Sequence, residues 1–319
     1  MAELLVIKPG LLTTVQDRGR WGFQSRGVSV AGPMDAYSHR LVNALVGNGD
    51  DAATLEVTAV GPLLEFDDER LIAVSGAEFD ADLDGRRVAP DQPCAAGPGS
   101  RLAFGSRRRG TRAYVAVAGG IAVAPVFGSR ATHVGSRLGG FDGRPLRTGD
   151  RLPLGLKWER TPFQGSGPRT LLRQARPVPH GHAVVRVLVG PQADYFTGEA
   201  LAALQASPYS IGQSSDRMGF RLEGTRLGHL RGADIISDAT PMGAIQVPAS
   251  GLPILLMADR QTTGGYPKIA TVITADLGLA GQLGPGDTLS FAVCSPGEAL
   301  AALIAQERAL MAIERPEVA

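Results

Sequence analysis

The chain is poor in cysteine and in long apolar runs. Its two cysteines, Cys94 and Cys294, are too few for a disulfide framework. No apolar run reaches the ~18 residues of a membrane-spanning helix, and the N-terminal stretch MAELLVIKPG lacks the long apolar segment of a signal peptide. We therefore expect a soluble, cytoplasmic protein without a membrane partner.

An excess of charge of either sign is also missing. The chain has 32 Lys and Arg against 31 Asp and Glu, which gives a formal net charge of +1. A near-neutral chain has no global field that would attract nucleic acid. We interpret the run Arg107–Arg109 as a solvated turn between two strands, and we expect no nucleic-acid partner.

Lysine is scarce, and the lysines that occur lie outside familiar motifs. Lys8, Lys157 and Lys268 stand in the triplets IKP, LKW and PKI. None belongs to the Gly-Lys-Ser/Thr end of a P-loop, and none lies in the Met-flanked hairpin of a biotin carrier. The G-x-S-x-G elbow of many hydrolases and zinc-type Cys/His spacings are absent too. The sequence therefore predicts no metal site and no familiar nucleotide or serine-hydrolase chemistry.

Glycine, proline and short apolar segments are abundant. The chain has 42 glycines and 22 prolines, without the period of collagen. Short runs rich in Val, Ile, Leu and Phe, bounded by Gly, Pro or Asp, are typical of strands. This pattern predicts a mainly β protein. The expected strands are 4–8, 71–77, 101–104, 112–120, 184–190, 252–257, 270–274 and 288–293.

Helical patterns are few. The clearest is PMDAYSHRLVNALVGN, residues 33–48, in which Pro33 suits the first helical position and Gly47 can end the helix. Two further helices are expected over 191–206 and 297–314. The predicted class is therefore mainly β with a few helices.

Recurring turn-and-strand patterns divide the chain into two similar β-rich halves. PGSRLAFG at 98–105 and PGDTLSF at 285–291 both place a polar turn ahead of an apolar strand. Residues 159–181 have the Pro, Gly and Arg composition of a linker. We expect one domain over 1–158, this linker, a second domain over 182–296 and a helical tail over 297–319.

The stretch ADRQTTGGYPKIATV, residues 258–272, keeps a lysine in a chain that uses arginine almost everywhere. Buried charges need partners, so its polar residues either pair with each other or face a cleft. Arginine stays protonated, whereas a partly desolvated lysine can lose its proton. We hypothesise a donor or base at Lys268, while structural Asp–Arg pairing stays open. The catalytic candidates are Lys268, Asp259, Arg260, Tyr266, Asp216 and Arg217.

Two other glycine-rich clusters precede this stretch. In residues 13–35, Gln16, Asp17 and Asp35 stand ahead of the first helix, whose N–H groups could bind an anion. The alternative is that Asp35 only caps the helix. We interpret residues 128–150 as a turn-rich hairpin that needs no function. The candidate substrate-binding residues are Gln16, Asp17, Asp35, Thr263, Gly264 and Gln246.

Several of these stretches together resemble one family over residues 4–293. They include QDRGRWG, GPMDAYSHRLVNALVGN, GSRATHVGSRLGG, SSDRMGFRLEG and PMGAIQVPASGLPILLMADRQTTGGYPKIATV. The family is KipA, also called allophanate hydrolase subunit 2 or the biotin-dependent carboxyltransferase-like family. Its bacterial members include PxpC, the C subunit of 5-oxoprolinase.

The resemblance implies a fold, partners and a reaction. The expected fold is two cyclophilin-like β-barrel domains. The expected partners are the KipI-type B subunit of such an enzyme and a third chain, its A subunit. The assembled complex opens 5-oxoproline to glutamate with ATP. Which chain binds ATP is left open, and the isolated chain can be inactive.

Two alternatives remain. The first is a carboxyltransferase subunit that acts on urea or a similar small amide with carboxybiotin. The second is a non-catalytic regulator that binds a KipI-like kinase inhibitor.

Overall fold

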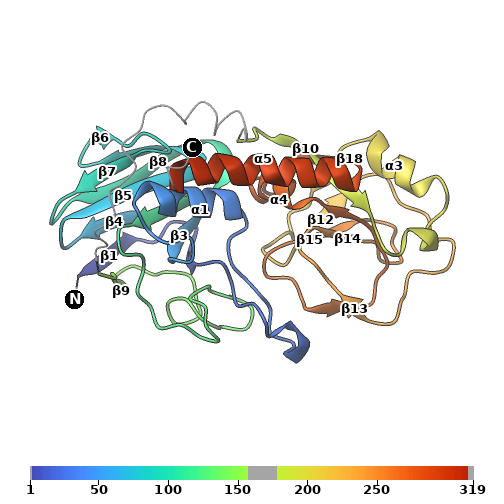
Figure 1. The fold of residues 1–319 in the computed structure, drawn as a ribbon, viewed down its shortest axis with the longest axis horizontal. Coiled ribbons are helices and arrows are strands. Elements are labelled where there is room, and N and C mark those ends of the chain that lie inside the picture. The colour runs from blue at the N-terminus through green and yellow to red at the C-terminus, as the bar shows by residue number, and fades with distance from the viewer. Residues whose placement is uncertain (1, 157–177, 315–319) are drawn as a thin grey trace. The chain divides into compact units, whose positions relative to one another are not determined.

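The computed structural model describes residues 2–156 and 178–314, and its contacts group into two compact units (Figure 1). The first unit comprises Met1–Arg20, Ala31–Val178 and Glu307–Ala319, and the second comprises Trp21–Val30 and Pro179–Gln306. The expected linker, 159–181, lies outside the described residues except for 178–181. Among the described residues, no helix is both long and apolar enough to cross a bilayer.

A nine-stranded sheet forms the framework of the first unit. Its main path has the order β2-β3-β8-β4-β1-β9, and β5 pairs with β6, β7 and β8. The strands are β1 (Glu3–Lys8), β2 (Leu12–Gln16), β3 (Thr54–Thr58), β4 (Leu63–Phe66), β5 (Arg70–Leu83), β6 (Arg86–Arg87), β7 (Pro93–Ala96), β8 (Arg101–Val117) and β9 (Arg151–Pro153).

In β1, burial alternates from one residue to the next, although Leu4, Leu5, Val6 and Ile7 are all apolar. Leu4 and Val6 of β1 are fully buried, while their neighbours in the strand are not, which is the period of two of a half-buried strand. The exposed run Arg107–Arg109 lies inside the long strand β8. Our expectation of a turn there was wrong, since β8 continues through it and pairs with β5 across irregular register.

Helix α1 (Ala36–Leu45) packs on this sheet against β5 and β8 (Figure 1). It begins later than expected, because Asp35 is its N-cap and Pro33 lies ahead of it. Gly47 follows its end with φ of 76°. Leu41 and Val42 join a buried cluster that also contains Leu310 from the C-terminal helix.

The segment 128–150 does not form the expected hairpin. Within the described residues it contains turns and isolated bridges, such as His133 with Leu138, in place of paired strands. Gly140 has φ of 55°, and a Cβ there would lie 1.9 Å from Thr132 Oγ1. Both the backbone conformation and the close packing therefore require glycine at this position.

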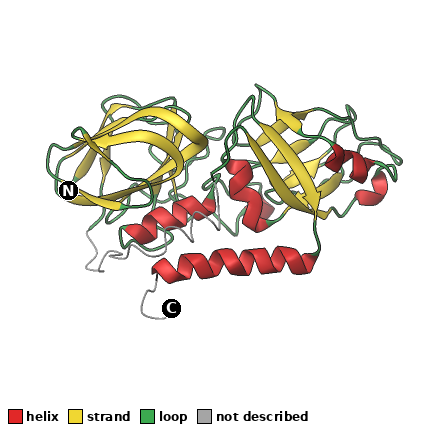
Figure 2. Cartoon of the chain, turned by 90° about the horizontal axis from the view of Figure 1, so that it is seen from above, coloured by secondary structure: helices red, strands yellow, loops and turns green. Residues whose placement is uncertain are grey.

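The second unit is built on a closed barrel with the order β10-β17-β14-β15-β12-β11-β18 (Figure 2). A separate two-stranded ribbon pairs β13 (Asp238–Ala239) with β16 (Thr263–Gly264). The barrel strands are β10 (His182–Val189), β11 (Tyr209–Ile211), β12 (Gly219–Glu223), β14 (Ala244–Gln246), β15 (Ile254–Leu256), β17 (Lys268–Val272) and β18 (Thr288–Val293).

The expected helix over 191–206 is divided into a short 3-10 helix, η2 (Ala193–Tyr195), and α3 (Ala200–Ala206). The sequence did not predict α4 (Thr274–Gly281), whose small residues show no amphipathic stripe. The C-terminal helix α5 (Pro296–Glu314) agrees with expectation. The fold class, mainly β with barrel sheets and a few helices, is confirmed.

The observed first unit differs from the predicted first domain, 1–158, at more than one segment, since it also contains Glu307–Ala319 of the expected tail. Residues Trp21–Val30, which contain the 3-10 helix η1 (Gln24–Arg26), group with the second unit. Within that unit, the Ser29 hydroxyl donates a hydrogen bond to the backbone oxygen of Arg260 at 2.9 Å. This contact ties the inserted segment to the polar stretch that the sequence singled out.

Candidate functional site

Lys268 is the first residue of β17, and its side chain is buried in the second unit. The residue is only 2% exposed, and its Nζ lies 2.8 Å from Oδ2 of Asp238. The Asp238 side chain is 49% exposed, so the ion pair has one buried end and one end open to solvent. The carboxylate is therefore the end of this ion pair that solvent reaches, while the amine is buried.

Asp238 is fixed in place by several donors. The strand pairing of β13 with β16 sets its backbone opposite Gly264. Its carboxylate accepts hydrogen bonds from Lys268 and from the Ala239 N–H, and a longer one from Gln192 at 3.4 Å. The hydrogen bond from Lys268, followed by that from Ala239, lowers the pKa of Asp238. The group is therefore a carboxylate at neutral pH.

Asp259 does not pair with Lys268. Instead, its two oxygens accept hydrogen bonds from Arg217 Nη2 at 2.9 Å and from Arg217 Nε at 3.1 Å. Both side chains are buried, and the Asp259 N–H also donates to the Arg217 backbone oxygen. Arg217 and Asp259 therefore form a buried ion pair with two hydrogen bonds. Structural Asp–Arg pairing is the alternative that the sequence had left open for them.

Asp216 makes a local turn. Its Oδ1 accepts hydrogen bonds from the N–H of Met218 at 2.8 Å and from the N–H of Gly219 at 3.3 Å. The side chain of Lys268 bonds to Asp238 and to neither Asp216 nor Asp259 among the described residues. The structure therefore replaces the expected acidic neighbours with an acid that the sequence had not singled out.

Arg260 lies on the segment that follows β15 and is 9% exposed. Its Nε donates to the backbone oxygen of Thr240 at 2.7 Å, and its Nη1 donates a longer bond to the oxygen of Met257. Burial lowers the pKa of Arg260 to about 10, and the nearby charge of Asp259 opposes this shift. The guanidinium remains protonated at neutral pH.

A pair of amide side chains borders the same region. Gln246 is buried on β14, and its Oε1 accepts a hydrogen bond from Gln261 at 3.3 Å. Its Nε2 donates to the backbone oxygen of Tyr266 at 3.4 Å, while Tyr266 is 41% exposed. Thr263 and Gly264 form β16 beside them. A Cβ on Gly264 would lie 2.6 Å from the Gln246 amide nitrogen, so glycine allows this close approach.

The candidates of the first unit form a different, internal arrangement. Gln16 is fully buried, and its Nε2 donates to Thr14 Oγ1 and to the Thr132 backbone oxygen. Asp17 accepts hydrogen bonds from Ser129 Oγ at 2.6 Å and from the Gly19 N–H at 2.9 Å. These bonds fasten the segment after β2 to the segment 129–132, which is a structural task.

The N-terminus of α1 already holds an anion, and that anion belongs to the protein. The Met34 N–H donates to Glu56 Oε2 at 2.9 Å, and the Asp35 N–H donates to the hydroxyl of Tyr114 at 2.9 Å. The Asp35 carboxylate accepts from Ser38 N and Ser38 Oγ. Asp35 thus acts as the cap, and Glu56 occupies the position that we had expected a ligand to take.

Tyr114→Phe is expected to lower the free energy of unfolding by about 1–3 kcal/mol, because it removes a buried donor and acceptor together. The Tyr114 hydroxyl donates to Glu56 at 2.7 Å and accepts from Asp35 N–H. Urea unfolding measures the change. Tyr195→Phe is the control, because Tyr195 is only half-buried. Equal stabilities of the two variants would contradict this role.

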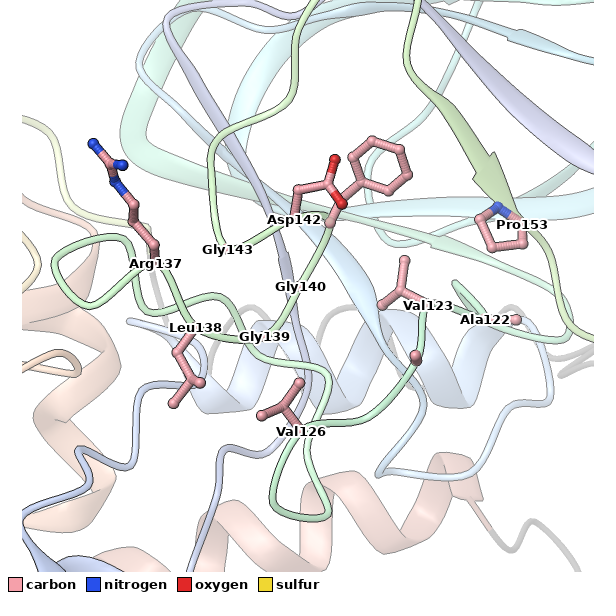
Figure 3. A pocket seen from close by; sticks show the side chains of 12 residues that line it. Ala122, Val123, Val126, Arg137, Leu138, Gly139, Gly140, Asp142, Gly143 and Pro153 are labelled. Carbon is pink, nitrogen blue, oxygen red and sulfur yellow. The ribbon is translucent and has the colours of Figure 1, made fainter.

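The first unit also contains a pocket of about 460 Å³. Its lining is largely apolar and includes Val123, Val126, Leu138 and Phe141 (Figure 3). Two charged residues, Arg137 and Asp142, line it, and Asp142 contacts Arg144 at 3.4 Å. None of the predicted site residues lines this pocket. We therefore place the candidate site at the ion pair of the second unit, where polar groups from several strands converge.

The sequence missed two members of this site, Asp238 and Gln192. A buried lysine requires an acid, so a partner for Lys268 could have been anticipated. Its identity depends on the pairing of β13 with β16, which joins distant parts of the chain. Among the described residues, no group of three or more His, Cys, Asp or Glu side chains could hold a metal ion.

Comparison with known proteins gives a consistent result along most of the chain. Residues 26–293 match a family model described as carboxyltransferase domain, subdomain A and B. The Escherichia coli protein named as the C subunit of 5-oxoprolinase is 39% identical over 305 residues, covering 96% of this chain and 96% of that protein. The Haemophilus influenzae protein of the same name is 33% identical and covers 94% of this chain and 93% of its own length.

A solved structure is similar in fold as well as in sequence. The crystal structure of the K. lactis urea amidolyase matches with a TM-score of 0.90 and 32% identity. The match covers 98% of this chain and 20% of that much longer chain.

Proposed function

We propose, since the chain belongs to the family of carboxyltransferase domains with subdomains A and B, that it is the C subunit of an ATP-dependent 5-oxoprolinase. In this proposal the assembled complex opens the lactam ring of 5-oxoproline to give glutamate. Its partners are the KipI-type B subunit of that enzyme and a third chain, the A subunit. Catalysis by the isolated chain is not required.

One observation carries this choice of substrate. The 39% identity to the C subunit of E. coli 5-oxoprolinase extends over 96% of both chains. The similarity to the K. lactis urea amidolyase is confined to 20% of that chain. The rest of that longer chain lies outside the similarity.

The polar groups of the site suit an amide carbonyl. Lys268 has three ammonium protons, and among the described residues only Asp238 accepts one. The others can donate to the lactam oxygen, where negative charge develops as the carbonyl carbon is attacked. The half-exposed Asp238 can position a water molecule and take its proton. The carbon–nitrogen bond then breaks, and the released nitrogen takes up a proton.

ATP does not have a recognisable cradle on this chain. The sequence contains no Gly-Lys-Ser/Thr motif. At the N-terminus of helix α1, the side chain of Glu56 already accepts the hydrogen bond from the Met34 N–H. The described residues therefore do not fit a nucleotide by any arrangement that we identify. We assign ATP binding to a partner chain.

A urea-directed carboxyltransferase is the second candidate, favoured by the TM-score of 0.90 to the K. lactis urea amidolyase. Urea is also a small amide and could accept a hydrogen bond from Lys268. This function would need carboxybiotin from a separate carrier, because the chain carries no biotin-type lysine motif. A regulator that only binds a KipI-like protein would not need the buried ion pair at all.

The proposed function is tested by reconstitution. The purified chain is mixed with its two partner chains, and glutamate release from 5-oxoproline is followed with and without ATP. We expect release only with all three chains and ATP. Omitting each chain in turn is the control. A stable complex that releases no glutamate would overturn the proposal, and bicarbonate-dependent consumption of urea would favour the carboxyltransferase.

A further inference from the structure

We propose that Arg260 binds the carboxylate of the substrate, so that the site selects a lactam that carries a negative charge. This inference rests on the proposed function and deepens it, because it concerns which amides the site accepts. Arg260 recognises the carboxylate, which does not react, while Lys268 and Asp238 act on the reacting carbonyl.

Arg260 is a buried cation on which the charge of Asp259 acts, but no carboxylate bonds to it in the described part of the chain. Its hydrogen bonds go to the backbone oxygens of Thr240 and Met257, and it forms no ion pair with any described residue. Asp259 precedes it in the chain, but both oxygens of that carboxylate bond to Arg217. Each of the other cations in this region, Arg217 and Lys268, has a carboxylate partner.

A guanidinium held mainly by carbonyl dipoles is costly to bury, and burial lowers the pKa of Arg260 accordingly. An anion bound there would offset that cost. Arginine is well suited to this task, because its planar fork matches the two oxygens of a carboxylate. In the described part of the chain, Nη2 donates no hydrogen bond, which leaves an N–H edge for such a ligand.

The positions of Arg260 and Lys268 agree with a single small ligand. Lys268 bonds to Asp238 and Arg260 bonds to Thr240, so both cations attach to the same short segment. Both cations therefore bond to the same short stretch, where a ligand that carries a carbonyl oxygen and a carboxylate could engage them together.

The test compares charged and neutral lactams on the assembled three-chain complex. The substrates are 5-oxoproline, 5-oxoprolinamide and 2-pyrrolidinone, of which only the first carries a carboxylate. For the wild-type complex we expect KM for 5-oxoproline to be about ten- to a hundredfold below that for the neutral lactams. Equal KM values for all three would overturn the proposal, even if no variant of Arg260 folds.

The variant Arg260→Gln should then raise KM for 5-oxoproline by about ten- to a hundredfold and change kcat much less. Its KM values for the neutral lactams should stay within about twofold, because they never engaged the guanidinium. Arg260→Lys should recover part of the affinity. Arg221→Gln, at an exposed position of β12, is the matched control for the loss of an arginine.

The outcomes separate the two proposals. If the wild-type complex does not open 5-oxoproline, the proposed function fails. If the wild-type complex is active but Arg260→Gln raises KM for the charged and the neutral lactams by the same factor, the carboxylate assignment fails. In that case Arg260 has only a structural role. Thermal unfolding of the variant complex identifies that structural role directly.

Discussion

Lys268→Met is expected to lower kcat for 5-oxoproline in the assembled complex by about 10²–10³-fold, with a smaller change in KM. The methionine fills much of the same buried space but offers no proton to the lactam oxygen. Removing one donor that stabilises developing negative charge has an effect of this size. Steady-state measurements of ATP-dependent glutamate release determine both constants. The fold should survive, because Asp238, the partner left behind, is half exposed.

Two further variants, one at each member of the ion pair, identify what Lys268 and Asp238 contribute. Lys268→Arg keeps the charge but replaces a compact ammonium with a wider fork, and we expect most of the activity to be lost. Asp238→Asn keeps a hydrogen-bond acceptor but leaves the buried ammonium of Lys268 without its counter-charge, so it should lower both kcat and the stability of the second unit. If Lys268→Arg turned over 5-oxoproline at the wild-type rate, the titratable or compact amine would not be needed.

Local sequence patterns were sufficient for most of the fold. Short apolar runs bounded by Gly, Pro and Asp indicated strands such as β1 and β18, because a half-buried strand must alternate its side chains. The pattern failed where local signals were weak or ambiguous. Helix α4 has no amphipathic stripe, and the polar run Arg107–Arg109 looks like a turn although strand pairing carries β8 through it.

The site was predictable in part for a similar reason. Lys268 stood out because one lysine among so many arginines, next to a glycine pair, is locally visible. Its partner Asp238 was not visible, since the contact depends on a strand pairing between residues distant in sequence. Which acid pairs with which base is a tertiary property. Arg217 and Asp259 were likewise recognised as charged neighbours, but their two-point pairing needed the fold.

The candidates in the first unit have hydrogen-bond partners within the same unit. Gln16, Asp17 and Asp35 were singled out because buried or loop-borne polar groups often act on ligands. In the structure their hydrogen bonds end on other parts of the same unit, including Ser129, Thr132 and Ser38. Buried polar groups must be satisfied somewhere, and in a glycine-rich loop the neighbouring backbone is the nearest source of partners.

Asp259→Ala is expected to lower the free energy of unfolding by about 3–5 kcal/mol, because it leaves the buried Arg217 without its two-point partner. Both side chains are about 5–6% exposed, so water cannot readily replace the lost carboxylate. Chemical denaturation of the purified chain, followed by a probe of the second unit, measures the change. Arg231→Ala is the matched control, since its ion pair with Asp194 is exposed and should contribute less than about 1 kcal/mol.

The double variant Arg217→Met with Asp259→Leu separates two effects of Asp259→Ala: the unpaired buried charge of Arg217 and the loss of side-chain packing. Replacing both members of a buried pair with apolar side chains removes two desolvated charges together, and such replacements are often close to neutral. We therefore expect the double variant to be more stable than Asp259→Ala, with a coupling of about 1–3 kcal/mol in the double-mutant cycle. Additive losses would instead mean that the two side chains contribute independently, and that the pair does not organise the segment carrying Arg260.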